Sequence, residues 1–295
     1  MNEPCIVCGQ GMKKKFRYKA FDHYRCQVCR HITALPYPTD QEIEVHYKKG
    51  FESKNYFFVR KFNDIYRGAL KHYINVLEKA LQETGRKLEG LSLLDIGCFK
   101  GDFLHLAMES GLDAYGIELQ QEAVDLANRS LPNRVFRGNL VRDHVELPIE
   151  KFDIVTVLAL VEHLVDPRSL LERATAYLKP DGIIVVQTPN SDSMIAKIMG
   201  RYWPMYSPVE HIQLFSNKSL KTLLTQIGVS PVRMKNHVKT LSIDYVYHML
   251  EVFGPEIQTL LKPFYKITPE FIRNLKLPFY AGETIILGQL GHAKN

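Results

Sequence analysis

Apolar and polar positions form their clearest pattern between Leu91 and Glu118. The apolar stretch from Leu91 to Ile96 predicts a buried strand, and a glycine-spaced turn follows it. A helix is predicted from Asp102, and a second apolar strand ends on Glu118. This order of elements predicts a strand–turn–helix–strand unit of an α/β fold.

Helical and strand patterns continue to alternate after Glu118. The run from Phe152 to Leu160 is apolar on both faces, as expected for a central strand of a parallel sheet. We therefore predict an α/β fold with a Rossmann-like sheet and helices on both faces. The other predicted elements are strands at 134–136, 183–187, 229–235 and 283–290, helices at 120–130 and 168–178, and a helix between Ser216 and Gly228.

Three segments depart from this alternation. Residues 56–82 carry apolar side chains at helical spacing, which predicts an amphipathic helix packed on the sheet. Residues 191–216, the lid segment, hold the only tryptophan and are predicted to cover the substrate. Residues 241–276 are predicted to be a helical insertion that completes the substrate pocket or forms a dimer face.

Prolines in residues 34–40 mark a domain boundary, and Asp40 is predicted to cap a short helix after it. We divide the chain into a cysteine module at 1–40, a helical linker at 41–90 and an α/β domain at 91–295.

Length and charge limit the classes of protein that fit. A chain of 295 residues can bury one sizeable core and carry an appendage. Residues 1–31 hold seven Lys and Arg against two Asp and Glu, so they account for +5 of the net charge of +6. Such a segment could contact nucleic acid. Cations also offset the negative charge of a zinc–thiolate site, and we favour this explanation.

The sequence has no secretion signal and no apolar run of about 20 residues, so we expect a cytoplasmic protein without a membrane segment.

Four of the five cysteines form two Cys-x-x-Cys pairs, Cys5 with Cys8 and Cys26 with Cys29. Two such pairs at this separation match a zinc ribbon, in which each pair supplies one knuckle of a tetrahedral site. A module of about thirty residues cannot bury a sufficient core, so a structural Zn²⁺ explains it better than free thiols do.

The glycine turn after the first strand of the α/β domain has the spacing G-x-x-x-G. Glycine at its tightest points lets a ligand come close to main-chain amides. A dinucleotide site would require G-x-G-x-x-G, so this turn suits a cofactor without phosphates. Glu118, at the end of the second strand, is placed to accept hydrogen bonds from ribose hydroxyls.

With these features, the chain from about Leu91 to Leu290 resembles the class I S-adenosylmethionine-dependent methyltransferases. The resemblance rests on LLDIGCFKG, on the GIE that closes strand two, and on LxxVEHLxDP and EHxxxFS. The last two are typical of the branch with ubiquinone-biosynthesis and sugar-modifying enzymes. The resemblance implies S-adenosylmethionine as cofactor, with Asn139, where the family more often has Asp, bonding the adenine amino group. The residues expected to contact the cofactor are Asp95, Gly97, Cys98, Phe99, Gly101, Phe103, Glu118, Leu119, Asn139, Leu140, Leu158 and His163.

Methyl transfer from a sulfonium is an in-line displacement, in which the protein mainly aligns the reactants. A hydroxyl or carbon acceptor must also lose a proton, for which histidine suits neutral pH. His211 is our first choice of base and His163 the second, with Glu162 beside them at a strand end. No acid cluster of the catechol-methyltransferase kind is recognised, so we predict transfer without a metal. Cys98 has no partner that would activate it as a nucleophile.

We predict a small-molecule substrate, and the architecture resembles enzymes that methylate sugars or nucleotide-linked sugars. Two alternatives stay open: an RNA methyltransferase that uses the basic module, and a protein that holds the cofactor without turnover. The sequence leaves open which atom is methylated, which residue is the base and what the oligomeric state is.

Overall fold

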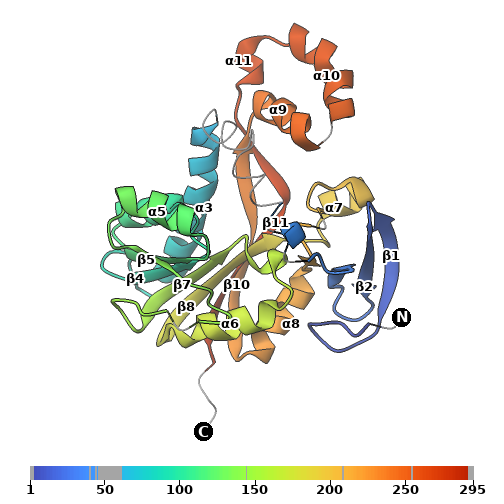
Figure 1. Cartoon of the computed structure of the whole chain (residues 1–295). Helices are drawn as coiled ribbons and strands as arrows, with labels where there is room; N and C mark the ends of the chain where they lie inside the picture. Colours follow the sequence, from blue (N-terminus) through green and yellow to red (C-terminus); the bar gives the residue numbers. More distant parts are fainter. Residues whose placement is uncertain are drawn as a thin grey trace.

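The computed structural model describes residues 3–39, 41–43, 45, 62–143, 145–207, 209–253 and 255–291. These residues form two β-sheets, helices on both faces of the larger sheet, and a separate group of helices within residues 243–273 (Figure 1). Within these ranges, every helix is too short or too polar to cross a lipid bilayer.

The larger sheet has seven strands in the order β10-β11-β8-β7-β4-β5-β6. Strands β4 to β8 are parallel, whereas β11 is antiparallel to both β8 and β10. The predicted α/β class with a Rossmann-like sheet is confirmed. The strands are β4 (Ser92–Ile96), β5 (Asp113–Glu118), β6 (Val135–Arg137), β7 (Phe152–Leu158), β8 (Leu178–Pro189), β10 (Val229–Leu241) and β11 (Leu277–Leu290).

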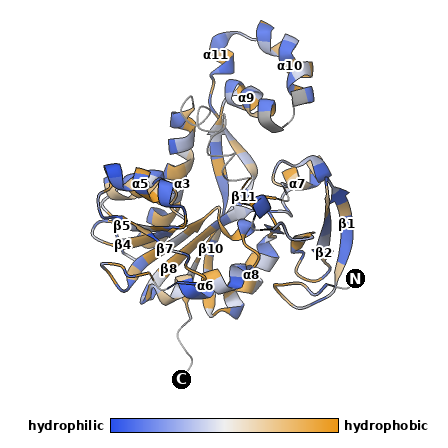
Figure 2. Ribbon diagram, in the orientation of Figure 1, coloured by the Kyte–Doolittle hydropathy of each residue, from blue (hydrophilic) through white to orange (hydrophobic). Residues whose placement is uncertain are grey.

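Helices bury both faces of this sheet, as the apolar pattern of β7 requires. One face packs against α3 (Asn63–Gln82), α4 (Asp102–Glu109) and α5 (Gln121–Ser130). The other face packs against α6 (Pro167–Ala176) and α8 (Asn217–Gln226). Figure 2 shows hydrophobic residues along the central strands and hydrophilic residues on the outer sides of the helices. Of the helix predicted at 56–82, residues 56–61 lie outside the described ranges.

Local capping explains where several helices begin. Asp166 accepts a hydrogen bond from the Ser169 amide at the start of α6, with Pro167 in the first turn. Ser216 caps α8. The predicted cap Asp40 lies outside the described ranges; the capping contacts at that point come from Thr39 and Glu42.

The smaller sheet joins the cysteine module to the lid segment. Strands β1 (Met12–Tyr18), β2 (Phe21–Cys26) and β3 (Ile32–Leu35) form an antiparallel ribbon. The fourth strand is β9 (Gln213–Leu214), from the lid segment, which also contains α7 (Met194–Met199) and η2 (Gly200–Tyr202). Trp203 and Tyr206 are buried in a cluster with Ile32. Trp203 and Tyr206 of the lid segment therefore pack on the module.

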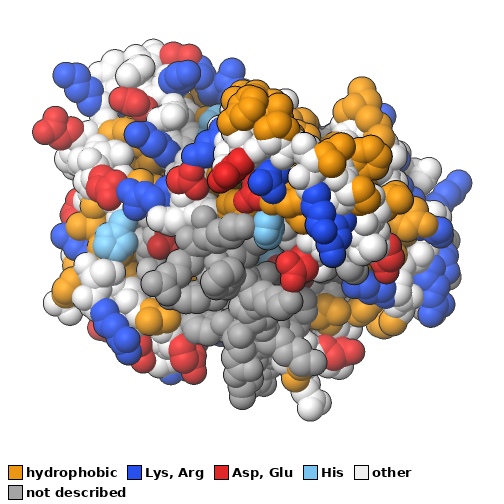
Figure 3. All heavy atoms as spheres, turned by 90° about the horizontal axis from the view of Figure 1, so that it is seen from above, with side chains coloured by type: hydrophobic (Ala, Val, Ile, Leu, Met, Phe, Trp, Pro, Cys, Tyr) orange, Lys and Arg blue, Asp and Glu red, His pale blue; other side chains and the backbone are white. Residues whose placement is uncertain are grey.

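The predicted insertion near the C-terminus is helical. It contains α9 (Ile243–Phe253), α10 (Pro255–Ile267) and α11 (Glu270–Arg273), which stand above the sheet at the ends of β10 and β11 (Figure 1). Leu260, Phe264, Ile267 and Phe271 on α10 and α11 are largely exposed. Hydrophobic side chains also gather on the molecular face seen from above in Figure 3.

Candidate functional site

The carboxyl ends of the parallel strands form the edge of the sheet where chemistry-bearing residues gather. Ligands of open α/β sheets bind at this edge because the loops that follow the strands diverge there. The turn after β4, Glu118 at the end of β5, η1 (Val161–His163) after β7 and Pro189 at the end of β8 all lie on it. We call the half formed by β4 and β5 the donor side, and the half formed by η1, β8 and the lid segment the acceptor side.

The turn on the donor side depends on its glycines. Gly97 and Gly101 have φ of +77° and +81°, a backbone conformation that residues with a Cβ rarely adopt. A Cβ on Gly97 would lie 2.9 Å from Leu160, and one on Gly101 would lie 2.8 Å from Leu131. Both glycines are therefore required by backbone conformation and by close packing from within the protein.

The Glu118 carboxylate closes the donor side. One oxygen accepts a hydrogen bond from the Phe99 amide at 2.9 Å, and the other accepts from the amides of Leu119 and Gln120 at 2.7 and 2.9 Å. Three amide donors hold this carboxylate at the strand end. The Phe99 and Leu119 side chains are 42% and 57% exposed, so accessible apolar surface flanks the Glu118 carboxylate.

Other predicted cofactor residues are less accessible. Phe103 and Leu140 are buried, and Leu158 is half-buried at the end of β7. Asp95 is buried within β4, where Thr156 Oγ donates to it at 2.6 Å. Burial raises the pKa of the Asp95 carboxyl to about 7.

Cys98 packs its side chain away from solvent. A Cβ placed on Gly116 would lie 2.4 Å from the Cys98 sulfur, so the Cys98 side chain packs directly against Gly116 of β5. Burial raises the pKa of the Cys98 thiol well above its usual value, which disfavours the thiolate a nucleophile needs.

Asn139 uses its side chain in a local turn. Its amide oxygen accepts a hydrogen bond from the Val141 amide at 3.1 Å, and its own main-chain amide donates to Asp143 at 2.9 Å. The turn fixes the orientation of Asn139 next to β6. The adenine contact expected for Asn139 stays a prediction.

On the acceptor side, Glu162 is almost completely buried in η1. Thr188 Oγ, at the end of β8, donates to it at 2.9 Å. Burial raises the pKa of the Glu162 carboxyl to about 8, so the group can gain or lose a proton near neutral pH.

His163 and His211 meet although they come from distant segments. Their ring centroids lie 4.9 Å apart at an interplanar angle of 62°. His163 Nδ1 donates to the Glu210 carbonyl at 2.7 Å, and His211 Nδ1 donates to the Met205 carbonyl at 2.9 Å. Because both Nδ1 atoms face carbonyl oxygens, which only accept hydrogen bonds, each ring carries a proton on Nδ1, and in its neutral form Nε2 is the basic nitrogen.

These three residues also form a donor set for a divalent cation. One Glu162 oxygen and one ring nitrogen each of His163 and His211 lie within 4.8 Å of one another. Two imidazoles and a carboxylate suit transition metals, and the carbonyl partners of the two Nδ1 atoms are typical supports of histidine ligands. The arrangement can therefore act in proton transfer or bind a cation.

The four paired cysteines converge within the cysteine module. The Cys5–Cys29 and Cys8–Cys26 sulfur pairs are 3.4 and 3.5 Å apart, and all four sulfurs lie within 4.8 Å of one another. Tetrahedral zinc with bonds of about 2.3 Å places sulfurs about 3.8 Å apart, close to the observed spacing. The sulfurs thus fit a Zn²⁺ ion. His31, which flanks the second pair, bonds to Gln213 instead.

The polar network behind the acceptor side was not predicted from the sequence. Glu283 on β11 bonds His237 at 2.8 Å and Lys239 at 2.6 Å, and Gln187 donates to it at 3.2 Å. Burial acts to raise the pKa of Glu283, but Lys239 and His237 outweigh it and lower the pKa to about 2. These residues sit on three different strands, so no local motif marks them. Gln213 was also missed, although it lies within EHxxxFS.

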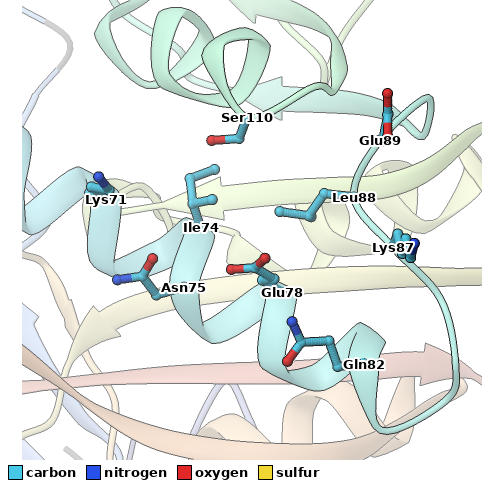
Figure 4. A pocket seen from close by; sticks show the side chains of 9 residues that line it. All are labelled: Lys71, Ile74, Asn75, Glu78, Gln82, Lys87, Leu88, Glu89 and Ser110. Atoms are coloured by element: carbon cyan, nitrogen blue, oxygen red, sulfur yellow. The ribbon is translucent and has the colours of Figure 1, made fainter.

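A cavity lies away from this edge. It has a volume of ≈ 520 Å³ and lies between α3 and the segments that precede β4 and follow α4 (Figure 4). These segments lead into the amino ends of β4 and β5, opposite the site. Its lining mixes charged and apolar side chains, namely Lys71, Ile74, Asn75, Glu78, Gln82, Lys87, Leu88, Glu89 and Ser110.

Comparison with known proteins gives consistent matches. The family described as "Methyltransferase domain" matches residues 66–233, more than half of the chain. The ubiquinone biosynthesis O-methyltransferase of Actinobacillus pleuropneumoniae is 30% identical over 128 residues, which cover 40% of this chain and 55% of that protein. The chain spans about half the length of the curated relatives it matches.

Solved structures share the fold. The 1,6-didemethyltoxoflavin-N1-methyltransferase of Burkholderia thailandensis matches with a TM-score of 0.52 and 13% identity, covering 95% of this chain and 100% of that one. The magnesium protoporphyrin IX methyltransferase of Synechocystis PCC 6803 also gives a TM-score of 0.52 and 13% identity, covering 83% and 99%.

Proposed function

The chain belongs to the methyltransferase-domain family, and we propose that it is a class I enzyme that transfers a methyl group from S-adenosylmethionine to a small molecule. The observation that carries the proposal is the Glu118 carboxylate, fixed by three amides at the end of β5 beside the exposed Phe99 and Leu119 side chains. This arrangement offers acceptors to ribose hydroxyls and apolar surface to an adenine ring. Both solved structures named above hold S-adenosylhomocysteine, which supports the same cofactor here.

The acceptor would bind between η1 and the lid segment, with His211 as general base and His163 as its neighbour. The basic Nε2 atoms of the two rings and the buried Glu162 carboxyl support proton transfer at this point. A ubiquinone-biosynthesis O-methyltransferase among the relatives supports a hydroxyl acceptor, and the sugar or nucleotide-sugar substrate stays a narrower proposal. Transfer without a metal also stays a prediction, and the Glu162, His163 and His211 donor set is the feature that could contradict it.

The positive charge of the cysteine module is only weak support for an RNA substrate. Arg25 and Arg30 form ion pairs with Asp192 of the lid segment, and Lys14 pairs with Asp22. These cations are used within the protein, so we keep the small molecule as the proposed acceptor.

The decisive test starts from the cofactor. Calorimetry with S-adenosylhomocysteine should detect binding at one site per chain. Incubation with methyl-labelled S-adenosylmethionine and a metabolite extract should then give a labelled small molecule. Absence of binding would refute the donor site, and binding without any labelled product would favour a protein that holds the cofactor without turnover.

We further propose a structural Zn²⁺ held by Cys5, Cys8, Cys26 and Cys29. Elemental analysis of the purified protein should find one zinc per chain. Cys26→Ser should lose most of it, whereas Cys98→Ser, which removes the fifth cysteine, should keep it. Equal zinc content in the two variants would exclude the four-cysteine site.

A further inference from the structure

The segment that carries His211 is built into the cysteine module. Strand β9 begins two residues after His211 and pairs with β3, with Thr33 opposite Gln213 and Ile32 opposite Leu214. The Ala34 amide also donates to the Ile212 carbonyl at 3.0 Å. The position of His211 therefore depends on a sheet whose other three strands all come from the module.

Gln213 lies at the centre of this junction and is completely buried. Its side-chain oxygen accepts hydrogen bonds from Thr33 Oγ at 2.9 Å and His31 Nε2 at 2.8 Å, both in the module. Its amide nitrogen donates to the Val165 carbonyl at 3.4 Å. Val165 lies two residues after His163, so Gln213 connects the module to both histidine-bearing loops.

The cysteine knuckles reach the same region by a second route. Ser216, which caps α8, donates to the Cys29 carbonyl at 2.8 Å. The His31 ring also lies 4.8 Å from the Phe215 ring. The second knuckle is thus bonded to the residue that ends the EHxxxFS segment.

We infer that Gln213 is a positioning residue through which the cysteine module sets His211 beside His163, so that the module is a structural part of the acceptor site. The inference rests on the proposed role of His211 in the acceptor site. It assigns the module a role in alignment for catalysis and leaves cofactor binding to the donor side.

The test is the tautomer of the two imidazoles, read by NMR of the ¹⁵N-labelled full-length protein with S-adenosylhomocysteine bound. In the wild type, both rings should show the Nδ1–H form that their carbonyl contacts impose, and His211→Asn and His163→Asn identify the signals. In Gln213→Leu, the His211 signal should move towards the Nε2–H form that a neutral imidazole prefers in water. The Kd for S-adenosylhomocysteine should change less than about twofold, because the donor side has none of these contacts.

Gln258→Leu is the matched control, because Gln258 lies on α10 and bonds the Tyr247 carbonyl away from this junction. Thr33→Val is the milder variant if Gln213→Leu does not fold, because it removes one hydroxyl without changing shape. It should produce a smaller shift in the same direction. Once the acceptor is known, methyl transfer by Gln213→Leu should fall at least about tenfold.

The inference is overturned if folded Gln213→Leu and Thr33→Val leave the His211 and His163 signals no more changed than Gln258→Leu does. The proposed function fails separately, if the wild-type protein binds no S-adenosylhomocysteine. In that case the tautomers can still be compared in the free protein.

Discussion

The donor side and the acceptor side of the site are assembled in different ways. The donor side comes from one continuous unit, in which β4, the glycine turn, α4 and β5 follow each other from Ser92 to Glu118. The acceptor side combines η1, the end of β8, the lid segment and the cysteine module. A continuous unit fixes its geometry through local backbone conformation, whereas the acceptor side depends on long-range packing. Substrate choice can therefore change without altering the cofactor site.

Buried carboxylates of the protein differ in their charges according to the groups around them. Asp95 has Thr156 as its hydrogen-bond donor, and burial raises its pKa to about 7. Glu283 is also buried, but Lys239 and His237 lower its pKa to about 2. The acceptor side thus lies against a charged network that is formed before any substrate binds.

The largest effect is expected for His211→Gln, which removes the proposed base from the acceptor side. Methyl transfer should fall about 10³-fold, or roughly 4 kcal/mol, because a positioned general base contributes about 10²- to 10⁴-fold to the rate. The Kd for S-adenosylhomocysteine should stay within about twofold of wild type. Label transfer and calorimetry measure the two quantities. His248→Gln, on α9, is the control, and a comparable loss in it would exclude a specific role for His211.

The next effect concerns the pH dependence of stability. The pKa of Glu283 is lowered from 4.5 to about 2, so its stabilisation is present above pH 4.5 and is lost as the pH falls towards 2. Glu283→Gln should therefore reduce the free energy of unfolding by roughly 3 kcal/mol at neutral pH and little near pH 2. Urea unfolding across this pH range measures the free energy of unfolding of both proteins.

Asp95→Asn provides the opposite control for that experiment. The pKa of Asp95 is raised from 3.8 to about 7, so wild-type stability declines as the pH rises through this interval. The variant should lose the part of this decline that Asp95 causes, so that a shallower decline from Glu162 remains. The same direction of change in both variants would contradict the electrostatic contrast between Asp95 and Glu283.

A smaller effect is expected for Glu118→Gln on the donor side. The neutral amide weakens the charge-assisted bonds at the end of β5, so the Kd for S-adenosylhomocysteine should rise about 30-fold, or roughly 2 kcal/mol. Calorimetry measures the change. Glu122→Gln, exposed on α5, should bind like wild type; if the two variants bind equally, Glu118 does not contact the cofactor.

The smallest effect compares two glycines of similar conformation. Gly97 has φ +77° and a crowded Cβ position, whereas Gly85 has φ +72° and no heavy atom within 4 Å of its Cβ position. Gly97→Ala should cost about 1 kcal/mol more stability than Gly85→Ala, since Leu160 must move in addition to the backbone strain. Chemical denaturation measures both. An equal loss would mean that crowding at the turn has no energetic role.

Much of the fold could be predicted because its signals are local. Apolar runs predicted the strands of the larger sheet, and Ser216 marked the start of α8. The glycine turn and Glu118 were found for the same reason, since they occupy one short segment. The paired cysteines were also recognisable, because each knuckle needs only four residues.

The sequence by itself determined an α/β fold, a donor-side turn closed by Glu118 and a four-cysteine module, because each depends on residues close together in the chain. Only the tertiary structure decided that β9 completes the sheet of the module, that His163 meets His211, and that Glu283 draws His237 and Lys239 into a buried network. These contacts join segments far apart in the sequence, and their side chains show no periodicity that a linear pattern could reveal. They form because burial of the surrounding apolar residues brings the segments together, and the polar groups must then find partners there.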